Sequence, residues 1–131
     1  ARGKIPASLC CNLYNRRIKN VQGNGHAQDQ PNVTHDENGQ YITAIDNNTV
    51  IGYKYFIFDS VKSISVITRN AKGKFMVTKQ VGGKTAAIID LASGNNWQKA
   101  KSELTMKDGK QALYFTYIGK GKIDFREFEL L

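Results

Sequence analysis

The chain has 131 residues, which fits one domain spanning 1–131 that can bury a core without disulfides or metal ions. Its 19 basic and 11 acidic residues give a formal net charge of +8. An apolar fraction of 40% with many aromatic residues argues against disorder. No apolar run approaches the roughly 20 residues of a membrane-spanning helix. The start at Ala1 lacks a methionine and a signal-peptide core, which indicates a cut or processed chain.

Short strands are the predicted elements. Residues 1–39 are rich in Asn, Gly and Pro and predict an irregular entry segment. From residue 40 onward, short apolar and β-branched runs alternate with turn signals, and no window shows a helical period. The predicted strands are Gln40–Ile45, Val50–Phe58, Val61–Thr68, Lys74–Lys79, Thr85–Leu91, Lys101–Met106, Gln111–Ile118 and Lys122–Leu130. Their spacing predicts an all-β fold, an antiparallel two-sheet β-sandwich or barrel in a single domain.

Two details of strand pairing follow from local pattern. In the strongest run, Ile51, Tyr53, Tyr55 and Ile57 alternate onto one face. The dipeptide Asp108-Gly109 favours a tight turn with positive φ, so we expect a hairpin between the strands on either side of it.

Basic charge is concentrated in two stretches, 1–20 and 60–89, which contain no acid. Such stretches fit a polyanion: nucleic acid, an acidic polysaccharide or an acidic protein surface. They equally fit outward strand positions, where Lys discourages edge pairing.

The cysteines and histidines argue against a metal or disulfide scaffold. Cys10 and Cys11 are adjacent, so we expect two free thiols, at least one of them buried. The Cys-x-x-Cys spacing of zinc sites is absent, and His26 and His35 stand in turn-like stretches, which indicates surface or loop-anchoring roles.

One pair of carboxylates has the spacing of catalytic groups. Glu127 and Glu129 are two residues apart and share one face of a strand, as the acid and base of a glycosidase could. A solvated charge pair near the chain end is the simpler interpretation, and we expect no catalysis.

Trp97, the only tryptophan, stands in a loop-like stretch with Asn95, Asn96 and Gln98. An indole among amides can stack on a sugar ring while the amides bind its hydroxyls. We therefore expect Trp97 to be largely exposed at one end of the sandwich. The alternative is that it closes the end of the fold.

Three segments together resemble a family 6-type carbohydrate-binding module, as found at the C-terminus of family 43 glycoside hydrolases. They are Tyr41–Phe56, the loop Gly94–Gln98, and the pair of strands from Leu113-Tyr114-Phe115 through Ile123-Asp124-Phe125. The resemblance covers about two thirds of the chain. It implies a lectin-like β-sandwich (jelly roll) without catalytic machinery. It also implies an oligosaccharide or polysaccharide ligand, a parent glycoside hydrolase acting on plant-type polysaccharide, and a secreted or cell-surface bacterial location, with a cytoplasmic one left open.

The resemblance also places a site. It implies a sugar held between two aromatic residues beside an Asn, among the loops at one end of the sandwich. Trp97 matches one aromatic residue, whereas the second position falls on Ala44 and the Asn position on Lys122. Tyr41 lies nearby, but its spacing from Ala44 puts it on the opposite face of a strand.

The same resemblance implies a structural calcium ion. Asp124 matches a late Asp ligand, whereas the stretch Ile5–Leu9, where an early Glu is expected, has no carboxylate.

Two further functions stay open at this stage. The module could be purely structural, packing on a catalytic domain. It could also be a basic domain for polyanions such as single-stranded nucleic acid, using Tyr and Phe in strands.

Overall fold

A computed structural model describes residues 3–15, 30–80 and 83–131, with the side chain of residue 15 left out. The strands are β1 Gly3–Pro6, β2 Asn12–Asn15, β3 Asn32–Asp36, β4 Gly39–Ile45, β5 Thr49–Phe58, β6 Ser63–Arg69, β7 Gly73–Thr78, β8 Thr85–Asp90, β9 Gln98–Glu103, β10 Gly109–Gly119 and β11 Ile123–Leu130. One 3₁₀ turn, η1, covers Ala7–Leu9. In these ranges no helix is long and apolar enough to cross a membrane.

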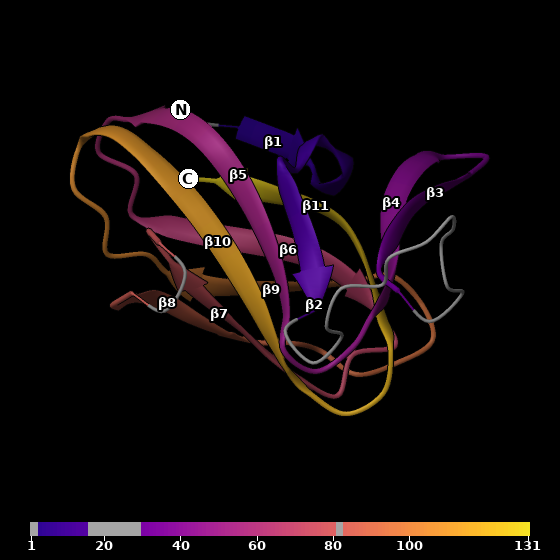
Figure 1. Ribbon diagram of the computed structural model, residues 1–131. Helices are drawn as coiled ribbons and strands as arrows, with labels where there is room; N and C mark the ends of the chain where they lie inside the picture. The colour runs from indigo at the N-terminus through magenta and orange to yellow at the C-terminus, as the bar shows by residue number, and fades with distance from the viewer. Residues whose placement is uncertain (1–2, 16–29, 81–82) are drawn as a thin grey trace.

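The strands form two antiparallel sheets (Figure 1). Sheet A has the order β3-β4-β11-β6-β9, with β1 also paired to β11. Sheet B has the order β2-β5-β10-β7-β8. Because Gly3 pairs with Leu130, the first and last described strands lie side by side, and both ends of the chain fall on one side of the molecule (Figure 1).

The core lies between the sheets and is strongly aromatic. Phe115 of β10 contacts Tyr53 and Phe75 in its own sheet and Phe125 and Phe128 of the facing sheet, with ring centroids 5.1–5.6 Å apart. The Tyr53 hydroxyl donates a hydrogen bond of 2.7 Å to the Ala7 carbonyl and so satisfies its buried polar atom. This contact joins the first turn of the chain to the core.

The antiparallel two-sheet sandwich expected from sequence is confirmed. Seven of the eight predicted strands lie within two residues of an observed one, counted against β4 to β8, β10 and β11. The strand predicted at Lys101–Met106 lies three residues too late, because β9 covers Gln98–Glu103 and the chain then leaves the sheet.

The expected hairpin at Asp108-Gly109 is wrong. β9 belongs to sheet A and pairs with β6, whereas β10 belongs to sheet B and pairs with β5 and β7. Gly109 has the positive φ that the dipeptide favours, but the Asp108 carboxylate accepts a hydrogen bond from the Ser60 backbone N–H. The turn therefore fastens a crossing between the sheets.

The expected alternation along β5 fails halfway. Ile51 and Tyr53 are buried, but Tyr55 and Ile57 are 58% and 62% exposed, and Phe58 is buried instead. The register between β5 and β10 shifts between Gln111 and Leu113, and this bulge turns the following residues over.

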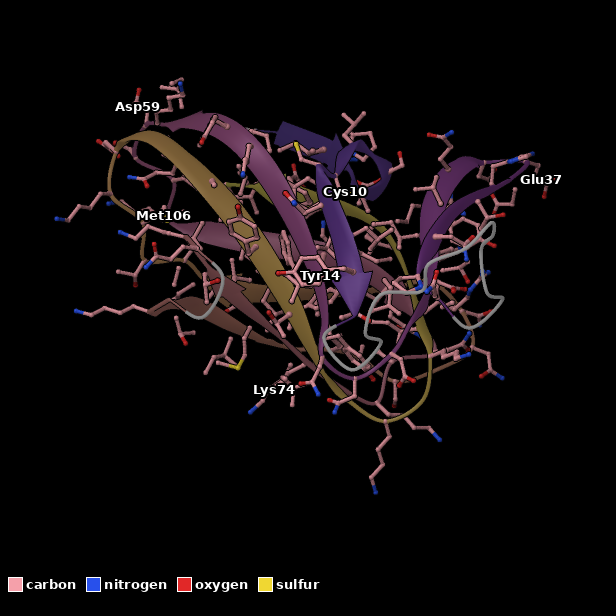
Figure 2. All side chains as sticks on the ribbon, in the orientation of Figure 1. Cys10, Tyr14, Glu37, Asp59, Lys74 and Met106 are labelled. Atoms are coloured by element: carbon pink, nitrogen blue, oxygen red, sulfur yellow. The ribbon has the colours of Figure 1, made fainter. Side chains whose placement is uncertain are left out.

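The entry segment 1–39 is less irregular than predicted, since it contributes β1, β2 and β3. Both thiols are free, as expected, but Cys10 is only partly buried and Cys11 is exposed, so neither is fully buried (Figure 2). Burial raises the pKa of the Cys10 thiol. His35 is exposed on β3, and His26 lies outside the described residues.

Candidate functional site

The structure separates the predicted ligand-binding residues into two groups. Asn95 and Lys122 line a hollow between loops at one end of the sandwich. Tyr41 and Trp97 contact each other at the outer face of sheet A. Gln98 begins β9, with its side-chain amide beside Gly94, and Asn96 is exposed without lining the hollow.

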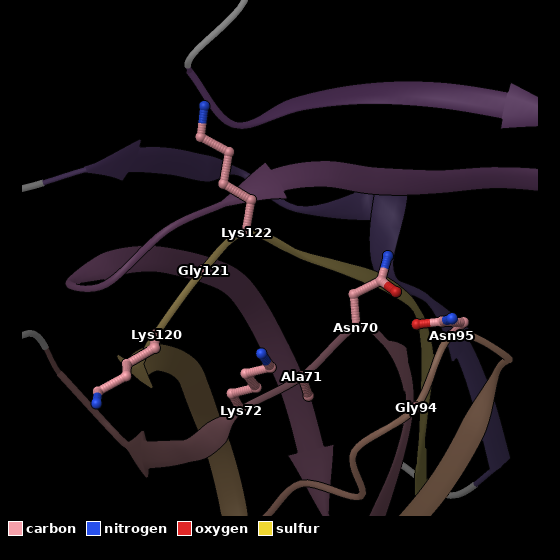
Figure 3. A pocket seen from close by; sticks show the side chains of 8 residues that line it. All are labelled: Asn70, Ala71, Lys72, Gly94, Asn95, Lys120, Gly121 and Lys122. Carbon is pink, nitrogen blue, oxygen red and sulfur yellow. The ribbon is translucent and has the colours of Figure 1, made fainter.

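The hollow at the loop end, called the loop hollow below, has a volume of about 370 Å³. This volume falls in the range of small-ligand pockets. Three connections build it: β6 to β7, β8 to β9, and β10 to β11 (Figure 3). Its lining residues are Asn70, Ala71, Lys72, Gly94, Asn95, Lys120, Gly121 and Lys122.

Hydrogen bonds join these loops to one another. The Asn70 N–H donates to the Gly94 carbonyl at 2.8 Å, and the Lys120 N–H donates to the Lys72 carbonyl at 3.1 Å. The Tyr117 hydroxyl accepts from the Lys72 N–H at 3.2 Å and donates to the Lys120 carbonyl at 2.9 Å. Burial raises the pKa of Tyr117, so this hydroxyl keeps its proton at neutral pH and can donate. The loop hollow is therefore held in shape without a ligand.

Trp97 is only partly buried, and its ring is covered by side chains from neighbouring strands. The guanidinium carbons of Arg69 and Arg126 lie 4.3 and 4.4 Å from its ring centroid. The Tyr41 ring meets it edge to face, with centroids 5.2 Å apart. The expectation of a largely exposed indole is wrong, because two arginines of sheet A make cation–π contacts where a sugar ring would stack.

Two carboxylates in turn bind the two arginines that contact Trp97. Asp124 accepts two hydrogen bonds from Arg69, at 2.9 and 2.7 Å, and Asp36 accepts one from Arg126 at 2.5 Å. Burial would raise the pKa of Asp36, but hydrogen bonds from the Asn38 backbone N–H and Arg126 hold it below its ordinary value. These fixed ion pairs orient the guanidinium groups over the indole.

The residues around Asp124 do not fit a calcium ion. Its Oδ1 accepts a hydrogen bond of 2.6 Å from the Thr43 hydroxyl, and its Oδ2 is bound by Arg69. Calcium needs several oxygen ligands with negative charge, and the guanidinium already neutralises this carboxylate. Across the ranges that the structure describes, no three His, Cys, Asp or Glu residues are grouped to hold a metal ion.

Glu127 and Glu129 share only a small cavity, whereas Glu127 alone also borders a hollow of about 260 Å³ that Glu129 does not line. Both line a cavity of only about 40 Å³ on sheet A, far below the size of ligand pockets. Glu129 lies 3.9 Å from the Lys99 ammonium. The pair therefore has the surroundings of surface charges.

The sequence reasoning missed the residues that surround both groups. Arg69 and Arg126 carry no motif, and only the β11–β6 register brings them together on one face. Lys72 and Lys120 stand in turns visible in the sequence, but only the pairing of β7 with β10 places those turns side by side. Local sequence patterns do not show which strands pair when they are far apart in the chain.

Known proteins similar to this chain were found by sequence and by structure, although no protein-family model matches it. A xylosidase/arabinosidase of Thermoclostridium stercorarium is 29% identical over 98% of this chain. The chain spans 29% of the length of that curated relative.

The similar solved structures include several carbohydrate-binding modules. A family 6 module of Clostridium cellulolyticum in complex with xylose matches with a TM-score of 0.80 and 14% identity, covering 98% of this chain and 95% of that one. A β-1,3-glucan-binding family 6 module of Bacillus halodurans gives 0.77 and 16%, covering 97% and 93%. A family 36 module in complex with calcium and xylotriose gives 0.65 and 15%, covering 98% of both.

The matches to family 6 modules cover nearly the whole chain, entry segment included, and thus extend beyond the segments that carry the resemblance in the sequence. The resemblance is confirmed: this chain has the fold of the family 6 carbohydrate-binding modules.

Proposed function

We propose that this chain is a non-catalytic carbohydrate-binding module of a glycoside hydrolase that acts on plant-type polysaccharide. The observation that carries the proposal is the family 6 fold over nearly the whole chain, combined with a preformed loop hollow of about 370 Å³. The family 6 neighbours are described with xylose and with β-1,3-glucan, so xylan-type and glucan-type chains are the first candidates. An extracellular location belongs to the same proposal. Structural calcium has no part in it, because Arg69 and Thr43 bind Asp124.

The position of the loop hollow suits a module joined to another domain. Lys122 at its rim immediately precedes β11, whereas the last residue of that strand, Leu130, pairs with Gly3. The eight residues of β11 therefore separate the hollow from both described ends of the chain, by about 26 Å at 3.3 Å per residue. A domain attached at either end leaves the hollow open to a polysaccharide.

Two neighbouring asparagines offer a matched test of where the sugar binds. Asn95 lines the loop hollow and Asn96 does not, although both are exposed. We expect Asn95→Ala to lower affinity for xylan-type or glucan-type oligosaccharides about fivefold, the effect of one lost hydrogen bond of about 1 kcal/mol. Isothermal titration calorimetry of the isolated chain measures this, with Asn96→Ala as the control. Equal losses in both variants would place the sugar elsewhere.

The non-catalytic part of the proposal has its own prediction. A glycosidase needs an acid and a base on either side of a bound sugar, and the cavity that Glu127 and Glu129 both line holds only about 40 Å³. We therefore expect the isolated chain to release no sugar from xylan or from aryl xylosides and arabinosides. Turnover that disappears in Glu127→Gln or Glu129→Gln would show that the chain is an enzyme.

Packing on a catalytic domain is the second candidate function, and the outer face of sheet B favours it. Register places five residues in one row across that sheet: Tyr14, Val50, Thr116, Met76 and Ile88. Tyr14, labelled in Figure 2, is 39% exposed and Ile88 is 49% exposed, and Tyr55 and Ile57 extend the apolar surface along β5. Val50 in this row is buried, so the exposed apolar residues lie around it, and a group of exposed apolar residues on a sheet face is typical of interaction surfaces. This function needs no sugar affinity, so an isolated chain that binds no oligosaccharide favours it.

A further inference from the structure

The chemistry of the loop hollow is cationic. Three of its eight lining residues are lysines, Lys72, Lys120 and Lys122, and all three are exposed. Two more are asparagines, Asn70 and Asn95. Among the described residues that line the hollow there is neither a carboxylate nor an aromatic ring. A neutral sugar therefore finds no ring to stack on here, whereas an anion finds the ammonium groups of Lys72 and Lys120.

The lysines come from two loops that meet at the hollow. Lys72 lies between β6 and β7, and the other two lie between β10 and β11, where they extend outward in different directions (Figure 3). The backbone hydrogen bond from Lys120 to Lys72 and the two bonds of the Tyr117 hydroxyl fix these loops. The backbone is thus preorganised, while the ammonium groups of Lys72 and Lys120 stand on flexible four-carbon chains that can close on a bound anion.

The amides add a second kind of contact. The side chains of Asn70 and Asn95 lie on the same side of the hollow, on the loops that the Asn70–Gly94 hydrogen bond joins (Figure 3). A carboxamide both donates and accepts, so it suits sugar hydroxyls, whereas an ammonium group only donates and suits a carboxylate. A ligand that carries hydroxyls and a carboxylate on one ring uses both kinds of group.

We propose that the loop hollow binds a uronic-acid-containing oligosaccharide, with Lys72 and Lys120 beside the carboxylate and Asn70 and Asn95 on the hydroxyls. This inference rests on the proposed function and names the class of sugar. The basic stretch 60–89 contributes to it, since Lys72 belongs to that stretch. A nucleic acid fits the hollow less well than an acidic sugar. Its phosphates could contact the lysines, but the described residues lining the hollow include no aromatic ring on which its bases could stack.

A pair of matched sugars tests the proposal. Xylotriose carrying one glucuronic acid and unsubstituted xylotriose are titrated into the isolated chain by calorimetry, at about 0.02 M and about 0.5 M salt. We expect the acidic sugar to bind about tenfold more tightly at low salt, which corresponds to about 1.4 kcal/mol. That preference should shrink at high salt, since exposed charges are screened, while the affinity for neutral xylotriose stays unchanged.

Charge-removing variants locate the effect. Lys72→Gln combined with Lys120→Gln should abolish the preference, measured as the ratio of the affinities of the double variant for the two sugars. The double variant should fold, since both side chains are exposed and the contacts of these lysines between the loops come from their backbone atoms. Lys62→Gln is the control, because Lys62 precedes β6 and Asn70 follows it, so the strand separates this lysine from the hollow.

The outcomes separate the two proposals. Equal affinity for the two xylotrioses, or a preference that survives in the double variant, would overturn the acidic-sugar inference and leave the proposed function standing. Absence of binding to either sugar would overturn the acidic-sugar inference, and absence of binding to a β-glucan oligosaccharide as well would overturn the proposed function. Tighter binding of single-stranded oligothymidylate than of the acidic sugar would replace both with a polyanion-binding function.

Discussion

Trp97→Ala should lower the free energy of unfolding by about 3 kcal/mol, the lower end of the range for truncation of a buried aromatic residue. The indole is partly buried and contacts Tyr41, Arg69 and Arg126. Truncation removes two cation–π contacts and one ring contact and leaves a gap beside two ion pairs. Urea unfolding followed by circular dichroism measures the change, because the variant has no tryptophan left.

Tyr55→Ala is the matched control for this prediction. Tyr55 is 58% exposed and lies 4.7 Å from the Lys110 ammonium, so its truncation should cost about 0.5 kcal/mol. Trp97→Phe should recover part of the loss by keeping a ring between the arginines. A Trp97→Ala variant that unfolds at the wild-type urea concentration but loses oligosaccharide affinity would instead return Trp97 to a stacking role.

The sequence predicts the fold well because strand position depends on local alternation and on turn residues. It predicts pairing poorly, as the Asp108-Gly109 turn shows, because a tight-turn signal also fits a crossing between sheets. The prediction that Tyr55 and Ile57 share the face of Ile51 and Tyr53 was wrong for a related reason. A bulge depends on the partner strand β10, which the pattern of β5 does not contain.

The candidate site shows the same division. A loop of Gly, Asn and Trp was recognisable as a place where a sugar could bind, and Asn95 does line the loop hollow. The exposure of Trp97 was not predictable from that loop, because Arg69 and Arg126 reach the ring from other strands. Asp124 is a second example. The sequence shows a carboxylate of the type that binds calcium, but it does not show that the Arg69 guanidinium binds this carboxylate.

Gly119→Ala should have a comparably large effect, because it disturbs the core and the loop hollow together. A Cβ at this position would lie 2.5 Å from the Lys72 carbonyl oxygen and 2.6 Å from the Tyr117 hydroxyl. Neither neighbour can move freely, since the Lys72 carbonyl accepts from the Lys120 N–H and Tyr117 is buried. Overpacking of this kind costs about 3 kcal/mol at the upper end of its usual range.

The same substitution should also weaken oligosaccharide binding about tenfold or more, because the clash pushes apart the two loops that carry Lys72 and Lys120. Gly121→Ala is the matched control for stability in the same turn, since Gly121 itself lines the loop hollow. A Cβ there would meet nothing within 4 Å, and its φ of +71° costs an alanine only about 1 kcal/mol. Calorimetric titration and urea unfolding of both variants test this. If Gly119→Ala bound sugar as the wild type does while losing stability, the loop hollow would not be the binding site, since its walls could separate without effect on the ligand.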